Sequence, residues 1–427
     1  MSGSPVASHA VAAVWRIEAA RIVGALARYT GDFAMAEDLA QEALAEALVS
    51  WPRDGVPRNP AAWLMTVGRR RAIDAFRRRA ALDERYAALA SELDPGEATS
   101  GSPPDRREED DVLYDPERID DDVLALVFIS CHPVLSREAS VALTLRVLGG
   151  LTSDEIARAF VTPTATVQAR ITRAKKTLAA AQVPFEVPPP EERRERLSAV
   201  LSVIYLIFTE GSSATSGGEW IRTDLAREAI RQARVLARLM PTEPETQGLL
   251  ALLELTAARF PARVRDDGTP VLLEDQDRRR WDRSAIRRGR AALAEAGRIG
   301  RGLGAYGLQA CIAECHALAP SVEETDWDRI VLLYDALNSL APSPIVELNR
   351  AVAVSMARGP AAALPLVDAL VEAGDLKGSH LLPGVRGELL TRLDRTEEAR
   401  AELEAAIRLC PGERERAVLR GKLDALS

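Results

Sequence analysis

Apolar residues recur every three or four positions along most of this chain, the spacing typical of amphipathic α-helices. In the N-terminal part the pattern predicts helix from Val11 to about Trp51, with AEDLAQEALAEALVSW as its second part, and a further long helix from Ala61 to about Leu82. The three prolines and the glycine of WPRDGVPRNP (51–60) break the pattern between them. Further helical segments follow from Ile119 onward, so the sequence predicts an all-α fold.

A pair of short helices around a tight turn is predicted within LGGLTSDEIARAFVTPTATVQARITRAKKTL (148–178). Thr152, followed three residues later by Glu155, forms a capping box, which satisfies the free amide donors at a helix start. Thr162 and Pro163 are expected as the N-cap and first residue of the next helix, because proline has no amide proton to leave unpaired.

The second helix of this pair should bury Val167 and Ile171 and present a polar, basic face to solvent. This is the layout of a helix-turn-helix, whose second helix enters the major groove of duplex DNA. Spacing alone also allows a structural helix pair with a solvated charged face. Residues 66–79 (TVGRRRAIDAFRRR) hold six arginines against one aspartate, and this second basic element favours DNA binding.

Composition narrows the class of protein. A chain of 427 residues suggests about two to four domains, and its net charge of −8 argues against a generally basic nucleic-acid binder. Four cysteines are too few for a disulfide framework and fit a reducing compartment. The N-terminus lacks a signal pattern, and the longest apolar run, 197–208, is too short to span a bilayer. A cytoplasmic protein without a membrane partner is therefore expected.

An internal repeat marks the C-terminal part. Residues 351–370 align with 387–406 at an offset of 36 residues (387 minus 351), each copy reading as helix, short turn and alanine-leucine helix. Tetratricopeptide helix pairs repeat at about 34 residues. The sequence thus predicts tetratricopeptide-like repeats near 345–411, with a generic alanine-rich hairpin as the alternative.

Three motifs resemble those of bacterial sigma factors of the extracytoplasmic-function type. AEDLAQEALAEAL (36–48) is similar to the helix that docks on the polymerase clamp, NPAAWLMTVGRRRAIDAFRRR (59–79) to the helix that melts the −10 element, and 148–178 to the −35-reading helix-turn-helix. FISCHPVL, YLIFTEG, LLEDQDRRRWD and TDWDRIVLLYDALNSLAPSPIVELNRAVAV resemble the subgroup with a long tetratricopeptide-like extension. TEGSSATSGGEW departs from that subgroup, whose members usually have an aromatic residue after the glycine.

The resemblance implies a domain organisation. It places sigma region 2 in 10–82, an acidic flexible linker in 83–118, region 4 in 119–182 and the helical extension in 191–427. Core RNA polymerase and promoter DNA are the implied partners, and the extension is expected to bind a protein partner or to contact the rest of the chain. By the same resemblance the polymerase-docking residues are Asp38, Leu39, Gln41 and Glu42.

The −10 side requires aromatic faces for unpaired bases and arginines for phosphates. One helix offers both kinds of group: Trp63, Arg69, Arg70, Arg71, Phe76, Arg77 and Arg78. Helical spacing leaves open whether Trp63 faces DNA or the core. By resemblance, the preceding loop from Asp54 to Asn59 lines a pocket for a flipped-out base, which costs a few kcal/mol to extrude.

The −35 element is expected to be recognised as double-stranded DNA. Gln168 suits a bidentate contact with adenine and Arg173 one with guanine. The resemblance places Gln168, Ala169, Thr172 and Arg173 towards the bases, while phosphate contacts suit Arg170, Lys175 and Lys176. Thr164, at the helix start, completes the expected DNA-contacting set.

No catalytic constellation stands out, so an enzyme, a cofactor and a metal site are not expected. The expected function is that of a sigma factor that binds core polymerase and directs initiation at specific promoters, its C-terminal domain modulating activity or binding a partner. A conventional helix-turn-helix regulator with a helical sensory domain is the alternative, and a tetratricopeptide-like scaffold is a third reading.

Overall fold

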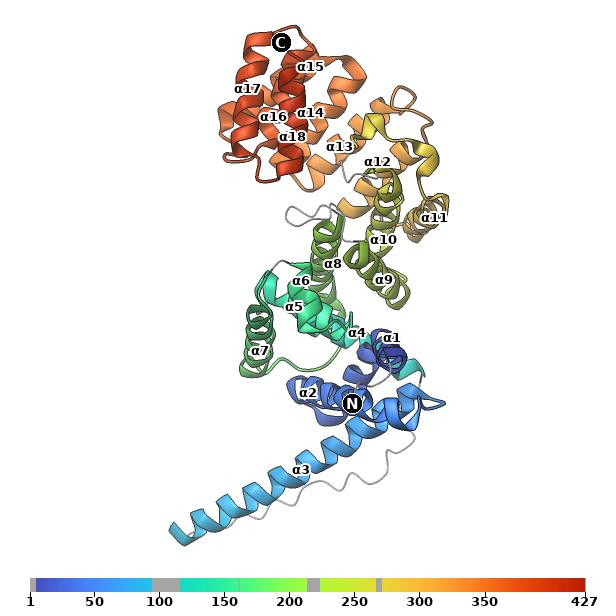
Figure 1. The fold of residues 1–427 in the computed structure, drawn as a ribbon, viewed down its shortest axis with the longest axis vertical. Helices are drawn as coiled ribbons and strands as arrows, with labels where there is room; N and C mark the ends of the chain where they lie inside the picture. Colours follow the sequence, from blue (N-terminus) through green and yellow to red (C-terminus); the bar gives the residue numbers. More distant parts are fainter. Residues whose placement is uncertain (1–4, 94–115, 161, 213–222, 266–270, 427) are drawn as a thin grey trace. The chain divides into compact units, whose positions relative to one another are not determined.

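Helices make up the regular structure throughout the described part of the chain (Figure 1). The computed structural model describes residues 5–93, 116–160, 162–212, 223–265 and 271–426. The chain divides into two compact units, Met1–Val203 (unit 1) and Ile204–Ser427 (unit 2). The all-α expectation is confirmed. No helix among the described residues is both long and apolar enough to cross a membrane.

Unit 1 begins with three packed helices, α1 (Pro5–Thr30), α2 (Phe33–Asp54) and α3 (Pro60–Leu93). Gly31, at a φ of 67°, ends α1, and the Asp32 side chain caps α2 by accepting from the Met35 amide at 3.0 Å. Gly68 lets α3 approach α1 closely, since a Cβ there would lie 2.9 Å from the side chain of Leu26.

Helix α3 continues past the expected end at Leu82 as far as Leu93. Residues 83–93 therefore form helix where the sequence suggested linker, because the alanine- and leucine-rich stretch YAALASEL keeps strong helix propensity up to the next proline. Of the rest of the expected linker, residues 94–115 lie outside the described residues, and 116–118 form the start of the next helix.

The second half of unit 1 contains α4 (Pro116–Ser130), α5 (Arg137–Val147), α6 (Ser153–Ala159) and α7 (Thr164–Ala180). Helix α8 (Pro190–Ser212) follows, and its first part belongs to unit 1 as far as Val203. In that part Leu197, Val200 and Leu201 are buried. The compact unit thus extends beyond the helix-turn-helix into α8.

Unit 2 opens with α9 (Thr223–Leu239) and α10 (Pro244–Ala257), which are followed by three short 3-10 helices, η2 (Phe260–Ala262), η3 (Leu273–Asp275) and η4 (Arg278–Arg280). α11 (Arg283–Ile299) and α12 (Ala305–Leu318) complete a core built around Leu255, Trp281 and Ala310. The buried Glu254 carboxylate of α10 joins three helices, because it bonds Arg234 of α9 and Arg288 of α11.

The rest of unit 2 is a series of helix pairs with a second core. Its helices are α13 (Trp327–Leu340), α14 (Pro344–Arg358), α15 (Pro360–Ala373), α16 (Leu381–Thr391), α17 (Thr396–Leu409) and α18 (Glu413–Asp424). Helix α14 pairs with α15 and α16 with α17, at the two copies of the repeat found in the sequence. The stretch 213–222, which holds most of TEGSSATSGGEW, lies outside the described residues.

Candidate nucleic-acid and polymerase interface

The helix-turn-helix of unit 1 is formed by α6 and α7. The capping box at its start is confirmed: the Glu155 amide donates to Thr152 Oγ1 at 3.1 Å, and the Thr152 amide donates to Glu155 Oε2 at 2.8 Å. Gly150, at a φ of 63°, makes the preceding turn where the chain passes within contact distance of Trp15 and Arg16 on α1.

The expected start of the second helix is wrong by one residue. α7 begins at Thr164 with Pro163 as its N-cap, and no side chain caps it. The Thr162 hydroxyl donates instead to the carbonyl of Phe160 at 3.0 Å. Thr164 is turned towards α6, where its hydroxyl donates to Asp154 at 2.8 Å, so this hydroxyl braces the helix pair.

Helix α7 divides cleanly into a buried and an exposed face. Val167 and Ile171 are buried as predicted, together with Ala174 and Leu178. The residues expected to face the bases are all exposed: Gln168, Ala169, Thr172 and Arg173. Lys176 is exposed on the same helix. The geometry therefore leaves a polar face free for a major groove.

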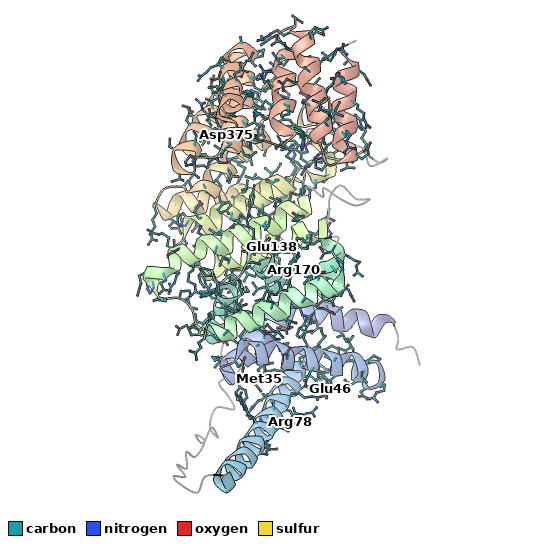
Figure 2. All side chains as sticks on the ribbon, turned by 90° about the vertical axis from the view of Figure 1, so that its left-hand side faces the viewer. Met35, Glu46, Arg78, Glu138, Arg170 and Asp375 are labelled. Atoms are coloured by element: carbon teal, nitrogen blue, oxygen red, sulfur yellow. The ribbon has the colours of Figure 1, made fainter. Side chains whose placement is uncertain are left out.

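Two basic residues of α7 are less available than the sequence suggested. Lys175 donates to Glu37 at 2.8 Å and to Asp38 at 2.5 Å, and its side chain is 13% exposed. Arg170 is half-buried and lies near Glu138, whose carboxylate it stabilises electrostatically (Figure 2). In this arrangement Lys175 holds α7 against α2, so it cannot contact a phosphate at the same time.

Glu37 is the centre of this contact. Its carboxylate, 4% exposed, accepts from Lys175 at 2.8 Å and from Arg146 at 3.0 Å. Burial raises the pKa of Glu37, but Lys175 and Arg146 outweigh that effect, and the pKa is lowered below its usual 4.5. A charged Glu37 thus ties α2 to both α5 and α7. A further ion pair, Arg16 with Glu155 at 2.5 Å, links α1 to α6.

Five of the arginines of α3 fall into two groups. Arg70 and Arg71 both bond Glu46 of α2, at 2.7 and 2.8 Å. The Arg71 contact is the largest cause of the lowered pKa of Glu46. These two arginines fasten α3 to α2, a role that the sequence analysis missed. In the sequence, the only sign of this role is the carboxylate of Glu46 on the preceding helix.

Arg77, Arg78 and Arg79 form the second group, at the exposed surface of α3 (Figure 2 labels Arg78). Within the described residues, none of the three makes an ion pair with a carboxylate. Arg79 was not among the predicted site residues, although it continues the same run. These three side chains form the free basic patch of α3.

Trp63 and Phe76 of α3 pack against other rings. Trp63 is half-buried, with its ring edge-on to the buried Trp51 at 5.6 Å between centroids. Phe76 lies 6.3 Å from Tyr29, and the Arg69 guanidinium stands over the Tyr29 ring. Each ring thus has one side committed to packing, and Trp63 serves partly as core.

The loop before α3 is open to solvent. Asp54 and Asn59 are exposed, and the Asn59 side chain accepts from the Ala62 amide at 3.1 Å. That bond caps the start of α3. The loop from Asp54 to Asn59 is thereby fixed at its end where the basic helix begins.

The predicted docking residues divide between surface and core. Leu39 is 5% exposed and packs inside unit 1, so its place on a docking surface is wrong in this arrangement. Asp38 and Glu42 are exposed and Gln41 is half-exposed. The same face of α2 continues through the exposed Val49, which the sequence analysis missed because its signal is only a helical spacing of seven from Glu42.

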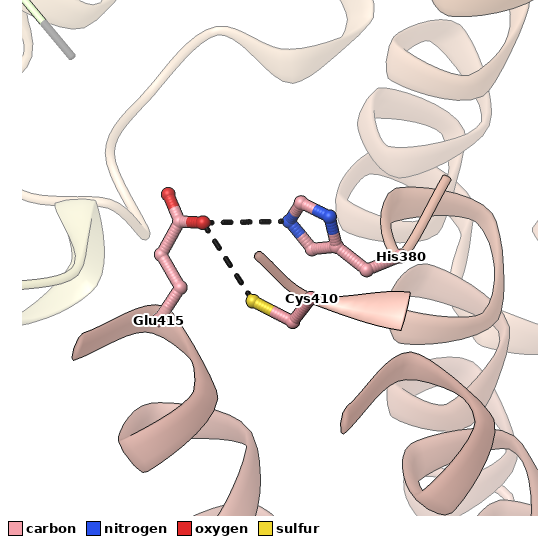
Figure 3. A group of neighbouring side chains, drawn as sticks. All are labelled: His380, Cys410 and Glu415. Carbon is pink, nitrogen blue, oxygen red and sulfur yellow. Dashed lines mark hydrogen bonds and ion pairs between the residues drawn. The ribbon is translucent and has the colours of Figure 1, made fainter. Parts of the chain in front are cut away.

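One group of side chains in unit 2 has the donor types of a metal site. His380, Cys410 and Glu415 place their ligand atoms within 4.8 Å of one another (Figure 3). Glu415 Oε2 lies 3.6 Å from His380 Nε2 and 3.8 Å from Cys410 Sγ. Burial raises the pKa of the Cys410 thiol, which donates to the Gly412 carbonyl, so metal binding would have to displace this proton.

Comparison with known proteins agrees with this geometry. Residues 15–81 match the model of sigma-70 region 2, and residues 126–178 match that of sigma-70 region 4. The chain belongs to the sigma-70 family. It is a sigma factor of the extracytoplasmic-function type with a C-terminal extension, and it directs transcription initiation, as the sequence predicted. Both regions are modules that bind polymerase and promoter DNA.

The extension of this sigma factor matches a further model, a family of unknown function (DUF6596), over residues 196–297. An uncharacterized protein of Rhizobium meliloti (strain 1021) is 46% identical over 405 residues, which cover 95% of this chain and 93% of that protein. No solved structure matches significantly.

Proposed function

We propose that this sigma factor reads the −35 element with the exposed face of α7 and holds the opened −10 region with the free basic patch of α3. The observation that carries the proposal is the division of α7, where the four base-facing candidates are exposed, while Val167, Ile171 and Ala174 on its other face are buried. Gln168 and Arg173 then supply bidentate contacts to bases.

The two kinds of contact on α7 can be told apart by substitution. Arg173→Ala is expected to weaken binding about tenfold at promoters with guanine at the contacted position and little elsewhere, because a bidentate base contact is worth about 1–3 kcal/mol. Lys176→Ala is expected to weaken all promoters alike, since phosphates carry no sequence information. Both residues are exposed, so neither change should affect folding.

The measurement is run-off transcription with core polymerase over a panel of promoters that differ only in the −35 element. Arg173→Lys is the matched control, because it keeps the charge but loses the planar fork. Equal losses on every promoter from both alanine variants would contradict the division between base and phosphate contacts.

For polymerase docking, we assign the exposed face of α2 formed by Asp38, Gln41, Glu42 and Val49. Asp38 joins this face once its ion pair with Lys175 is released. Its carboxylates suit a basic patch on another protein, and Val49, 65% exposed, adds an apolar contact. Glu42→Lys should reduce the affinity for core polymerase while leaving duplex binding by α7 intact.

The extension is proposed to modulate the promoter-binding unit or to bind a partner. Stacked helix pairs, such as α14–α15 and α16–α17, form surfaces suited to peptides or protein domains. Because the first part of α8 completes unit 1, the informative truncation ends at Val203 rather than directly after α7.

Truncation at Val203 is expected to change promoter output severalfold relative to the full chain. Higher output from the same amount of folded protein means that the extension inhibits, and lower output means that it assists. Circular dichroism and core-polymerase binding check that the shortened chain is folded. Unchanged output on every promoter would contradict a modulating role.

The alternative, a conventional regulator, binds duplex DNA without polymerase. Addition of the purified chain to core polymerase, followed by run-off transcription from genomic fragments, separates the two. Defined start sites that require the chain support the sigma factor. Duplex binding that neither recruits nor redirects polymerase would contradict it.

A further inference from the structure

Unit 2 contains a cavity of about 560 Å³ that the promoter-binding function does not use. It lies between the segment that follows α10 and the helices α14, α16 and α18. Its walls are largely aliphatic and include Val271 and Leu273 on one side and Val385, Leu389 and Leu419 on the other. Cavities of about 300–1,000 Å³ with such walls commonly bind small molecules.

Two arginines from the segment after α10 line this cavity. Arg259 lies over the Trp281 ring at 5.5 Å and donates to the Gln276 side chain at 3.3 Å. Arg263 donates to the backbone carbonyl of Ser212 at 3.1 Å. Within the described residues, neither guanidinium makes an ion pair with a carboxylate. Among the residues that the structure describes, each is held by neutral groups only, which leave its charge uncompensated.

The groups that shift the pKa of Arg259 include no negative charge. Burial lowers its pKa to about 10, and the neighbouring cations Arg263 and Arg278 add to the effect. Burial likewise lowers the pKa of Arg263. The neighbouring His316 has its pKa lowered to about 4 by burial, Arg259 and Arg278. Negative charge beside this group of cations would therefore be strongly favoured.

The acids on the cavity wall do not supply that charge. Glu388 bonds Lys422 at 2.6 Å, and Glu415 faces His380 at 3.6 Å. Glu274 is exposed at the edge. A third arginine, Arg392, donates to Ser355 Oγ at 2.9 Å and has no carboxylate partner among the described residues. The cavity thus combines an apolar interior with surplus positive charge.

We propose that this cavity binds a small organic anion with an apolar body, its acid group held by Arg259 and Arg263. Guanidinium groups suit carboxylate, sulfonate and phosphate, because their planar fork donates two parallel hydrogen bonds to such groups. The aliphatic walls cover the rest of the ligand. Binding at this site is independent of the promoter contacts, so it stands or falls apart from the function proposed above.

The test uses a pair of fluorescent probes with the same ring system. 8-Anilinonaphthalene-1-sulfonate carries an acid group, whereas N-phenyl-1-naphthylamine is neutral. The full chain is expected to bind the sulfonate at one site and at least about tenfold more tightly than the neutral probe, the effect of one charge-assisted contact. Equal affinity for both probes would overturn the proposal.

Three variants locate the site. Arg263→Gln and Arg259→Gln should each weaken sulfonate binding about tenfold and leave the neutral probe almost unchanged. Arg280→Gln is the control, since Arg280 is exposed on the nearby η4 and does not line the cavity. If Arg259→Gln fails to fold, Arg392→Gln replaces it, because Arg392 lies on the opposite wall. Unchanged sulfonate binding in folded arginine variants would overturn the proposal.

The chain itself offers a rival anion in the sequence DD at positions 266–267. The double variant Asp266→Asn, Asp267→Asn distinguishes the two sources of charge. Sulfonate binding that is already present in the unsubstituted chain supports an external ligand. Binding that appears only in the double variant would show that the acidic pair fills the site, which overturns the proposal.

Discussion

Replacing Arg77, Arg78 and Arg79 together by glutamine should reduce open-complex formation on the order of 100-fold, because charge-assisted contacts to phosphate are lost at three positions. These side chains are exposed on α3 and, within the described residues, make no ion pair. Their substitution therefore breaks no ion pair that holds the described part of the fold together. Arg70 and Arg71 differ, since their bonds to Glu46 hold α3 on α2.

The measurement is permanganate footprinting of the opened region at a promoter that the wild-type holoenzyme uses. The slope of log affinity against log salt should fall by about 2, as expected for three lost contacts to single strands. A matched control is the triple variant Arg280→Gln, Arg283→Gln, Arg287→Gln, which removes equal charge from exposed positions of unit 2. If the α3 variant opened the promoter as fully as the wild type, the basic patch of α3 would have no part in holding the separated strands.

Local patterns predicted much of the architecture. The capping box of Thr152 and Glu155, the burial of Val167 and Ile171 and the exposed readout face of α7 all follow from residues within one helical turn of each other. Such features depend on helix capping and on the spacing of apolar residues, and both are determined by residues that are close together in the sequence.

Contacts between distant segments were not predictable in this way. The sequence predicted a phosphate contact for Lys175, yet this side chain pairs with Glu37 and Asp38, more than a hundred residues away. Leu39 read as docking surface, yet it lies in the core. On an amphipathic helix, a charged side chain can bind a ligand or form an internal ion pair, and an apolar one can lie on a docking surface or in the core. Only the packing of whole helices decides between these roles.

The cavity of unit 2 lies beyond local reasoning for the same reason. Arg259 and Arg263 come from the segment after α10, while Val385 and Leu419 come from helices more than a hundred residues later. Neither segment shows a binding motif alone. The site exists only where apolar walls and uncompensated arginines meet.

The contact between α2 and α7 concerns how the sigma factor engages its promoter. The −10 and −35 elements are about 25 base pairs apart, roughly 85 Å of duplex at 3.4 Å per step. Lys175 of α7 touches Asp38 of α2 at 2.5 Å in the arrangement described here. The two regions must separate to reach both elements, so we expect this closed arrangement in the chain without polymerase.

Glu37→Gln should destabilise the closed arrangement by about 2–3 kcal/mol, because it leaves Arg146 and Lys175 partly buried without the central carboxylate. Lys175 keeps Asp38 as a partner, which makes the loss smaller than for a fully orphaned charge. Glu42→Gln is the control, since its contact with Arg71 is long, at 3.7 Å, and exposed. Thermal unfolding measures the loss, and energy transfer between dyes on α2 and α7 measures separation.

The same carboxylate predicts a pH dependence. The pKa of Glu37 is lowered in the folded chain, so its stabilisation is complete above the usual value of 4.5 and is lost as the pH falls through the folded pKa. Acidification should therefore open the wild-type chain below about pH 4.5, with the Glu37→Gln variant already open at higher pH. A dye separation in the variant equal to that of the wild type at neutral pH would show that Glu37 does not hold the regions together.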